Sequence, residues 1–399
     1  MQILLHDYGN YPFTRQLARE LAARGHAMDY VYSESTQLIK RGTANPSTKN
    51  LTVTGILLDK PFQKYNYLQR RRCEIEHGRK LAAIVERIRP DVVLSANTPL
   101  DAQELALRAS RKVGAKFVFW MQDAIGLATN QTLARKIPFL GSMVGDFYIQ
   151  REKEMLQRSD HVVLISEDFL PLMRSWQVDE THCTVIPNWA PLDEINVQSK
   201  HNAWAKAHAL DGKFCVIYTG ILGLKHNPAL FIQLAEAFKE NTDVRIVVVS
   251  AGDAIDWLTR EAKDRNLDNL VLLPPQPEDT YAQVLGTANV LLSILSESAG
   301  SYSVPSKVLS YLCAGRPLLL AVPEANLSTR IVQESNSGLV CAPDEIDCLA
   351  GNARMLYQNI NLAKKMAGNA HKYAEKTFDI STITDRFEKL LSKTLSNQV

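Results

Sequence analysis

The most informative stretch of the chain is residues 214–228, FCVIYTGILGLKHNP. Its first six residues, Phe214 to Thr219, are mostly apolar and β-prone, and they predict a short buried strand. A loop with two glycines and a lysine follows, and Asn227-Pro228 marks the expected start of a helix. A strand, a glycine-containing loop and a helix in this order are typical of parallel α/β folds.

The same alternation of apolar runs and helical patterns continues in both directions from this stretch, so the sequence predicts the α/β class. In the second half we expect further strands at Val244–Ser250, Leu270–Leu273, Val290–Ile294 and Pro317–Ala321. In the first half we expect strands at Ile3–His6, Met28–Tyr32, Leu51–Ile56, Val92–Ser95, Phe117–Met121, Val162–Ile165 and Thr184–Ile186.

The chain length and a polar segment predict two domains. A chain of 399 residues exceeds what one core usually organises. The polar segment Asp193–Gly212 separates the two series of strands, so we expect domains at residues 1–190 and 191–378. Residues 379–399 form an amphipathic helix pattern without a following strand. Two doubly wound units in series place a ligand cleft between them, at the carboxyl ends of the strands.

Composition excludes several classes of protein. Hydrophobic residues make up 46% of the chain, and the formal net charge of +2 gives no overall reason to expect nucleic acid. The six cysteines form no CxxC pair and indicate reduced core residues in the cytoplasm. The N-terminus resembles a buried strand rather than a signal peptide, and no stretch approaches the roughly 20 apolar residues of a membrane span.

The loop after Thr219 suits a diphosphate. Gly220 and Gly223 allow backbone amides to approach a ligand, the following helix N-terminus adds partial positive charge, and Lys225 adds a full charge. A plain strand-to-helix turn is the alternative, because this glycine spacing is common.

Residues 304–317, VPSKVLSYLCAGRP, predict a short helix with Ser306 as N-cap and Gly315 as its end. Ser306 and Lys307 at its N-terminus would add donors and charge for the same diphosphate. The alternative is a capped helix with a structural role alone.

These segments resemble the large retaining glycosyltransferase family with the two-domain GT-B fold, and the colanic-acid and O-antigen type most of all. The strand ending in Gln122-Asp123, the hinge at 185–189, the loop at 218–225 and the helix at 304–317 match in order and spacing. The resemblance implies two Rossmann-like domains facing across a cleft, with a C-terminal helix crossing back to the first domain. The first domain would bind the acceptor and the second the nucleotide-sugar.

Two positions depart from the family pattern. Many members have an arginine after the first loop glycine, where this chain has Ile221, and the usual second glutamate of the helix is replaced by Ser310. Glu297 is the candidate for the first glutamate, although its spacing to Pro305 is longer than usual. We interpret these departures as a change of subfamily.

The resemblance implies further site residues. Asp123 would orient the transferred sugar or the acceptor hydroxyl, and Gly9 would let the first loop approach the diphosphate. Backbone groups near Gln276 would contact the base, and Ser166 and Asn188 would line the cleft and hinge. Each of these residues could instead be a cap or turn residue.

The resemblance also implies the chemistry. We expect retaining transfer of a hexose, with a UDP-sugar favoured over a GDP-sugar, onto a lipid-linked or polysaccharide acceptor in cell-surface polysaccharide biosynthesis. No cofactor and no protein-bound metal are expected, since the sequence has no Asp-x-Asp and no His or Cys cluster with ligand spacing. Asp123, Lys225 and Glu297 are the candidate catalytic residues.

Two segments of the first domain indicate contact with an anionic membrane surface. Residues 60–72 mix aromatic and basic residues without an acid, and residues 133–155 place Arg135 and Lys136 among apolar side chains. The alternatives are a solvated basic helix and a buried apolar helix. The expected location is therefore the cytoplasm, with peripheral contact at the inner face of the plasma membrane.

Two other functions remain open from the sequence. A nucleotide-sugar 2-epimerase of GT-B fold would rearrange the donor without an acceptor, but its usual acidic and histidine residues cannot be placed here. A non-catalytic nucleotide-sugar-binding protein would fit Ser310 and the absent arginine.

Overall fold

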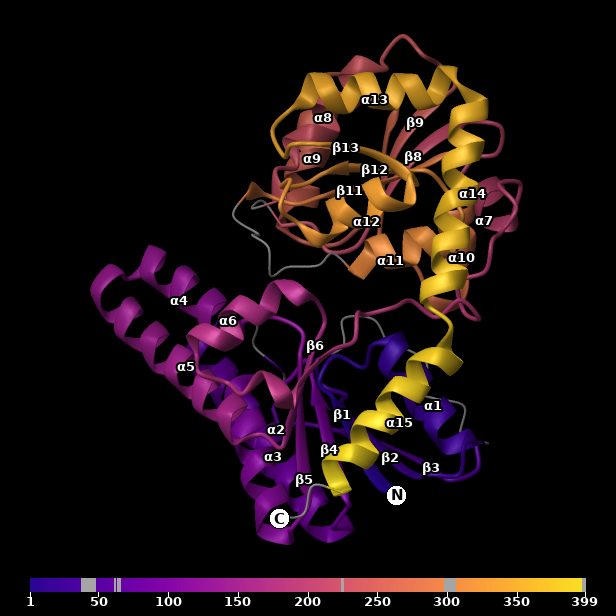
Figure 1. The fold of residues 1–399 in the computed structure, drawn as a ribbon. Coiled ribbons are helices and arrows are strands. Elements are labelled where there is room, and N and C mark those ends of the chain that lie inside the picture. Colours follow the sequence, from indigo (N-terminus) through magenta and orange to yellow (C-terminus); the bar gives the residue numbers. More distant parts are fainter. Residues whose placement is uncertain (37–47, 61, 63–65, 224–225, 298–305, 397–399) are drawn as a thin grey trace. The chain divides into compact units, whose positions relative to one another are not determined.

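The computed structural model describes residues 1–36, 48–60, 62, 66–223, 226–297 and 306–396. The chain divides into two compact units, each of which has its own parallel sheet (Figure 1). Unit 1 is Met1–Pro187 together with Ile380–Val399, and unit 2 is Asn188–Asp379. The expected α/β class with two Rossmann-like sheets is confirmed.

The sheet of unit 1 has seven parallel strands among the described residues, in the order β3-β2-β1-β4-β5-β6-β7. They are β1 (Gln2–Asp7), β2 (Ala27–Ser33), β3 (Leu51–Ile56), β4 (Val92–Ala96), β5 (Lys116–Met121), β6 (His161–Leu164) and β7 (Cys183–Val185). The strand order reverses between β1 and β4. In doubly wound sheets, a ligand binds beside such a reversal, at the carboxyl ends of the strands.

Helix α3 of unit 1 begins and ends where proline and glycine predict. Pro99 precedes α3, and Gly114 ends it in the left-handed region with φ of 81°. The helices are α1 (Pro12–Ala23), α2 (Tyr67–Ile88), α3 (Leu100–Val113), α4 (Ile125–Lys136), α5 (Pro138–Arg158), α6 (Leu170–Ser175) and, after unit 2, α15 (Ile380–Ser396).

The sheet of unit 2 has six parallel strands among the described residues, in the order β10-β9-β8-β11-β12-β13. They are β8 (Phe214–Thr219), β9 (Val244–Val249), β10 (Leu270–Leu273), β11 (Val290–Ile294), β12 (Leu318–Ala321) and β13 (Gly338–Cys341). Its helices are α7 (Ala203–Ala207), α8 (Ala229–Ala237), α9 (Asp253–Asp264), α10 (Tyr281–Thr287), α11 (Ser306–Cys313), α12 (Leu327–Ser335), α13 (Ile346–Gln358) and α14 (Ile360–Thr377).

Strand β13 is absent from the sequence-based expectation. It has four residues and begins with Gly338, so its apolar run is too short to be distinctive. A Cβ atom on Gly338 would lie 2.1 Å from the carbonyl oxygen of Leu318 on the neighbouring strand. Glycine therefore permits the close approach of β13 to β12.

Helix α15 packs on unit 1, beside α1, although it follows unit 2 in the chain (Figure 1). Phe387 is fully buried, and its ring centre lies 4.8 Å from that of Trp120 on β5. The expected return of the C-terminal helix to the first domain is confirmed.

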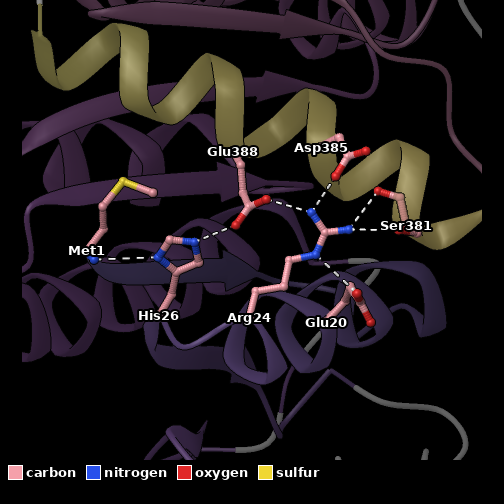
Figure 2. Close-up of polar contacts among 7 residues, drawn as sticks. All are labelled: Met1, Glu20, Arg24, His26, Ser381, Asp385 and Glu388. Atoms are coloured by element: carbon pink, nitrogen blue, oxygen red, sulfur yellow. Dashed lines mark hydrogen bonds and ion pairs between the residues drawn. The ribbon is translucent and has the colours of Figure 1, made fainter.

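A polar cluster at the end of α1 fixes the position of α15 (Figure 2). The Arg24 guanidinium donates to Asp385 at 2.5 Å, to Glu388 at 2.6 Å and to Glu20 at 3.1 Å. The Glu388 carboxylate also lies 2.7 Å from His26 Nε2. One guanidinium thus links α1 to two turns of α15, as a rigid fork of donors can.

Helices α4 and α5 form a tight pair that extends away from the sheet of unit 1 (Figure 1). A Cβ on Gly141 would lie 2.2 Å from the Leu133 carbonyl oxygen, and one on Gly145 would lie 2.4 Å from the Asn130 Cα atom. The two backbones therefore touch. No helix in the described part of the chain is long and apolar enough to cross a membrane.

Candidate active site

Unit 1 has a cavity of about 180 Å³ at the carboxyl ends of β1, β4 and β5. The strand order reverses here, between β1 and β4, and a doubly wound fold predicts a ligand site at this position. Its lining residues are Tyr8, Gly9, Tyr11, Asn97, Thr98, Gln103, Phe119, Trp120, Gln122, Asp123 and Ile125. Two of the sequence-predicted site residues, Gly9 and Asp123, therefore share one cavity.

The loop after β1 is organised by Asp7. The carboxylate accepts hydrogen bonds from the Gly9 amide at 3.0 Å, the Tyr11 amide at 2.5 Å and the Thr14 hydroxyl at 2.6 Å. A Cβ on Gly9 would lie 2.1 Å from the Tyr11 ring, so glycine leaves room for that ring. The structure thus gives Gly9 a packing role in addition to its place in the cavity wall.

Asp123 lies two residues after the end of β5 and contributes a carboxylate to the cavity. The residue is exposed to solvent, yet the surrounding protein atoms desolvate the carboxyl and raise its pKa to about 6. Asp123 therefore changes its charge close to neutral pH, which suits a group that exchanges hydrogen bonds with sugar hydroxyls.

Glu152 on α5 is a second carboxyl near the cavity, and no sequence motif points to it. Its oxygens accept from the Ile125 amide at 3.1 Å and the Gly126 amide at 2.8 Å, at the start of α4. The side chain is fully buried, and burial raises its pKa to about 8. The two bonds anchor the turn between Asp123 and α4.

In unit 2 the loop after β8 lies beside the N-terminal turn of α11. The Lys307 Nζ atom lies 3.8 Å from the centre of the Tyr218 ring, and a Cβ on Gly220 would lie 3.2 Å from that Nζ. Gly220, with φ of 119°, therefore leaves the space that Lys307 occupies. Burial lowers the pKa of Lys307 to about 7.

Three backbone amides in the described part of this loop are already bonded within the protein. The Gly220 amide donates to the Val249 carbonyl at 3.1 Å, and the Leu222 amide donates to the Ala251 carbonyl at 3.0 Å. The Gly223 amide donates to His226 Nδ1 at 3.0 Å. These three amides are therefore not free to donate to a diphosphate.

The remaining predicted residues are distributed as follows. Gln276 accepts from the buried Trp204 indole at 2.9 Å and donates to the Pro274 carbonyl at 2.8 Å, so its side chain is engaged. Ser166 caps a short 3-10 helix by accepting from the Asp168 amide at 3.2 Å. Ser306 is the exposed first residue of α11.

Three further predicted residues complete the set. Lys225 falls outside the described residues. Glu297 is exposed and is the last described residue before position 298. Asn188 is the first residue of unit 2. Within the described ranges, no group of three or more His, Cys, Asp or Glu side chains could hold a metal ion.

Comparisons with known proteins connect this geometry with a family. A model of the glycosyl transferase 4-like domain matches residues 11–189, and a model of glycosyl transferases group 1 matches residues 200–373. Together the two matches span most of both units. The chain belongs to the GT-B glycosyltransferases.

Solved structures of this glycosyltransferase fold cover nearly the whole chain. HepE from Anabaena in complex with UDP-glucose has a TM-score of 0.72 at 14% identity, over 98% of this chain and 100% of that chain. Sucrose-phosphate synthase from Thermosynechococcus elongatus has a TM-score of 0.72 at 14% identity, over 99% and 100%. WaaG, a glycosyltransferase involved in lipopolysaccharide biosynthesis, has a TM-score of 0.68 at 14% identity, over 98% and 99%. No match was found among curated protein sequences.

Proposed function

We propose that this glycosyltransferase transfers a hexose, with retention and without a protein-bound metal, from a UDP-sugar to a lipid-linked or polysaccharide acceptor in cell-surface polysaccharide biosynthesis. The observation that most supports a nucleotide-sugar donor is the pairing of Gly220 with Lys307 at the ends of β8 and α11. A UDP-sugar is favoured over a GDP-sugar because the similar HepE structure is a complex with UDP-glucose.

Lys307, Lys225 and Ser306 stabilise the departing nucleoside diphosphate in this proposal. Negative charge grows on the diphosphate as the glycosidic bond breaks, and a preorganised cation is most effective where water is excluded. Lys307 is held over the Tyr218 ring and is desolvated, so a diphosphate would restore the full charge of its ammonium group. Glu297 remains the candidate partner for the donor sugar.

Asp123 in the cavity of unit 1 orients a hydroxyl of the acceptor or of the transferred sugar. The cavity of about 180 Å³ has room for part of a sugar ring and is lined by aromatic rings and amide groups. None of its lining residues is a lysine or an arginine. It therefore suits a neutral, hydroxyl-rich group, and any phosphate of a lipid-linked acceptor would bind elsewhere.

The acceptor would be reached at a membrane surface, through the corner between α4 and α5. Six apolar side chains at this corner are exposed to solvent. Their exposed fractions are 54% for Ile137, 79% for Phe139, 63% for Leu140, 60% for Met143, 45% for Val144 and 50% for Phe147. An exposed apolar patch of this kind marks an interaction surface, and Arg135 beside it adds positive charge. This arrangement favours the membrane interpretation of residues 133–155 over a buried helix.

The basic segment at 60–72 contributes less charge than its sequence suggests. Arg70 pairs with Glu74 at 2.8 Å, and Arg71 pairs with the buried Asp101 at 3.0 Å. Residues 61 and 63–65 lie outside the described residues. We therefore assign the main membrane contact to the α4–α5 corner.

Two measurements test the proposed function. Thermal unfolding with a panel of UDP- and GDP-sugars identifies the donor, because a ligand of the native state raises stability with its concentration. Transfer of radiolabelled sugar from that donor into a lipid extract then tests for the transferase. Conversion of the donor sugar without an acceptor would indicate a 2-epimerase, and binding without any turnover would indicate a non-catalytic binder; either result overturns the proposal.

A further inference from the structure

Beneath the cavity of unit 1 lies a buried polar chain that runs from α2 through β1 to the cavity wall. His77 on α2 and His6 on β1 are both fully buried, and their Nε2 atoms are 2.9 Å apart. His6 Nδ1 lies 2.9 Å from the hydroxyl oxygen of Thr98, which lines the cavity. Gln103, another lining residue, bonds to Ser95 on β4.

The direction of each hydrogen bond in this chain follows from groups that can only accept. The Thr98 hydroxyl is 2.8 Å from the Ala96 carbonyl, which can only accept, and we assign its one proton to this bond. One amide atom of Gln103 lies 3.5 Å from the Ser95 carbonyl, and we assign it as the nitrogen. The other atom, the oxygen, therefore accepts the Ser95 hydroxyl proton at 2.7 Å.

This assignment sets the tautomers of both histidines. His6 Nδ1 lies 2.9 Å from the Thr98 oxygen and 3.3 Å from the Ser95 oxygen, and with both hydroxyl protons assigned elsewhere, His6 carries its proton on Nδ1 and donates it to Thr98. Burial lowers the pKa of both histidines, which keeps them neutral. The unprotonated Nε2 of His6 then accepts a proton from His77 Nε2. His77 is left with an unprotonated Nδ1, a buried acceptor that has no partner among the described residues.

We propose that His6 and His77 are positioning residues: the Nδ1–H of His6 donates to the Thr98 oxygen and holds this hydroxyl at the cavity wall, where it meets the hydroxyl groups of a neutral sugar or polyol. With its proton committed to Ala96, Thr98 presents an oxygen acceptor, and Gln103 presents its amide nitrogen as a donor. Asn97 donates its amide to Asp7 at 3.1 Å and presents its oxygen. This inference rests on the proposed function, because it assigns the hydroxyl groups to the acceptor.

The tautomers are tested first, without any activity. In protein labelled with ¹⁵N-histidine, we expect His6 as the Nδ1–H tautomer and His77 as the Nε2–H tautomer at neutral pH. The signals are assigned by their loss in His6→Asn and His77→Gln, among nine histidines in total. A His6 signal from the Nε2–H tautomer, or a charged ring at either position, overturns the inference.

Matched substitutions then test the role in transfer. An asparagine at position 6 retains a donor near the place of Nδ1, whereas a glutamine places its amide near Nε2 and leaves Thr98 without a donor. We expect His6→Gln to raise the acceptor KM by about 3- to 10-fold, the effect of one lost hydrogen bond, while His6→Asn stays near the wild type. The donor KM should change in neither variant.

Two substitutions of His77 test the same series of hydrogen bonds from its α2 end. His77→Gln keeps a donor for His6, and His77→Met removes it without a large loss of volume, so only the latter should raise the acceptor KM. The inference is overturned if the enzyme is active and the acceptor KM is the same for His6→Gln as for His6→Asn, and for His77→Met as for His77→Gln. That result leaves the proposed function intact. A wild-type protein that transfers no sugar overturns the proposed function, while the NMR result still decides the tautomers.

Discussion

At the scale of single residues, Lys307 combines two properties that rarely occur together, a cation and a desolvated position over an aromatic ring. Replacing it by alanine should lower transfer by about 100-fold, because a charge-assisted contact to the leaving group is lost. Steady-state kinetics on Lys307→Ala and on the exposed control Lys364→Ala would measure this effect. Similar turnover in the two variants would remove Lys307 from the site.

The pKa of Lys307 gives a second expectation, for donor binding as a function of pH. Burial lowers this pKa to about 7 in the free protein, so the ammonium group loses its charge as the pH rises above 7. Donor affinity should therefore fall between about pH 7 and pH 9. Lys307→Arg keeps its charge over this range, and the dependence should disappear in calorimetric titrations with the donor. A wild-type affinity that does not vary with pH would contradict this expectation.

His77 makes the stability of the protein depend on pH in the acidic range. Burial lowers its pKa to about 3 in the folded state, against about 6.5 when unfolded. Between these values the unfolded chain binds more protons, so the free energy of unfolding rises with pH, by up to about 1.4 kcal/mol per unit for this group. This contribution is fully present above pH 6.5 and is lost as the pH falls toward 3.

Urea unfolding between pH 5 and pH 7.5 checks this prediction. His77→Gln should show a shallower slope than the wild type. The same slope in both proteins would show that His77 is not held neutral.

At the scale of elements, the corner between α4 and α5 should determine membrane binding. Phe139→Ser with Leu140→Ser should reduce sedimentation with anionic vesicles even at high salt, where charge attraction is screened. Replacing Arg70, Arg71 and Arg72 by glutamine should have a smaller effect, since Arg70 and Arg71 already pair with acidic groups. Wild-type protein that stays in the supernatant at low and high salt would favour a soluble acceptor.

The attachment of α15 to α1 should depend on Arg24. Arg24→Gln removes the donors to Asp385 and Glu388, and we expect the melting temperature of unit 1 to fall by roughly 2–4 °C. Arg174→Gln is a matched control, because Arg174 pairs with Glu180 on the surface of the same unit. Equal shifts in the two variants would show that the Arg24 cluster is no stronger than an exposed ion pair.

Most elements of this fold could be predicted because each one has a local signal. Pro99 and Gly114 delimit α3, and the buried strands have apolar runs long enough to recognise. Strand β13 lacks such a run, and it exists because Gly338 fits against β12. The sequence therefore predicts elements whose signal is local and misses one whose signal lies in a neighbouring strand.

The site could be predicted only in part, for the same reason. Motifs located Asp123 and the pair Gly220 and Lys307, which lie at strand and helix ends. Nothing local pointed to Glu152, which is distinguished only by its bonds to the start of α4. Nor could the sequence show that the Gly223 amide is taken by His226, because that requires the loop conformation.

For the whole molecule, the division into two units predicts two unfolding transitions. A chain that ends at Phe378 lacks α15, so unit 1 should unfold at a lower temperature, because the Trp120 ring and its neighbours lose the cover of Phe387. A UDP-sugar should still raise the transition of unit 2 by the same amount. Calorimetry with and without donor separates the unfolding transitions of the two units. A truncated protein with wild-type transitions and activity would refute the role of α15.

The position of α15 also has a consequence for biosynthesis. A ribosome makes the strands of unit 1 first, then all of unit 2, and only afterwards the helix that covers Trp120 and α1. Until that last helix emerges, the nascent first unit exposes an apolar surface that chaperones and proteases recognise in incomplete chains. A chain truncated within unit 2 would lack α15 and would therefore be recognised as incomplete and degraded. Only chains that include α15 would cover Trp120, which lines the cavity.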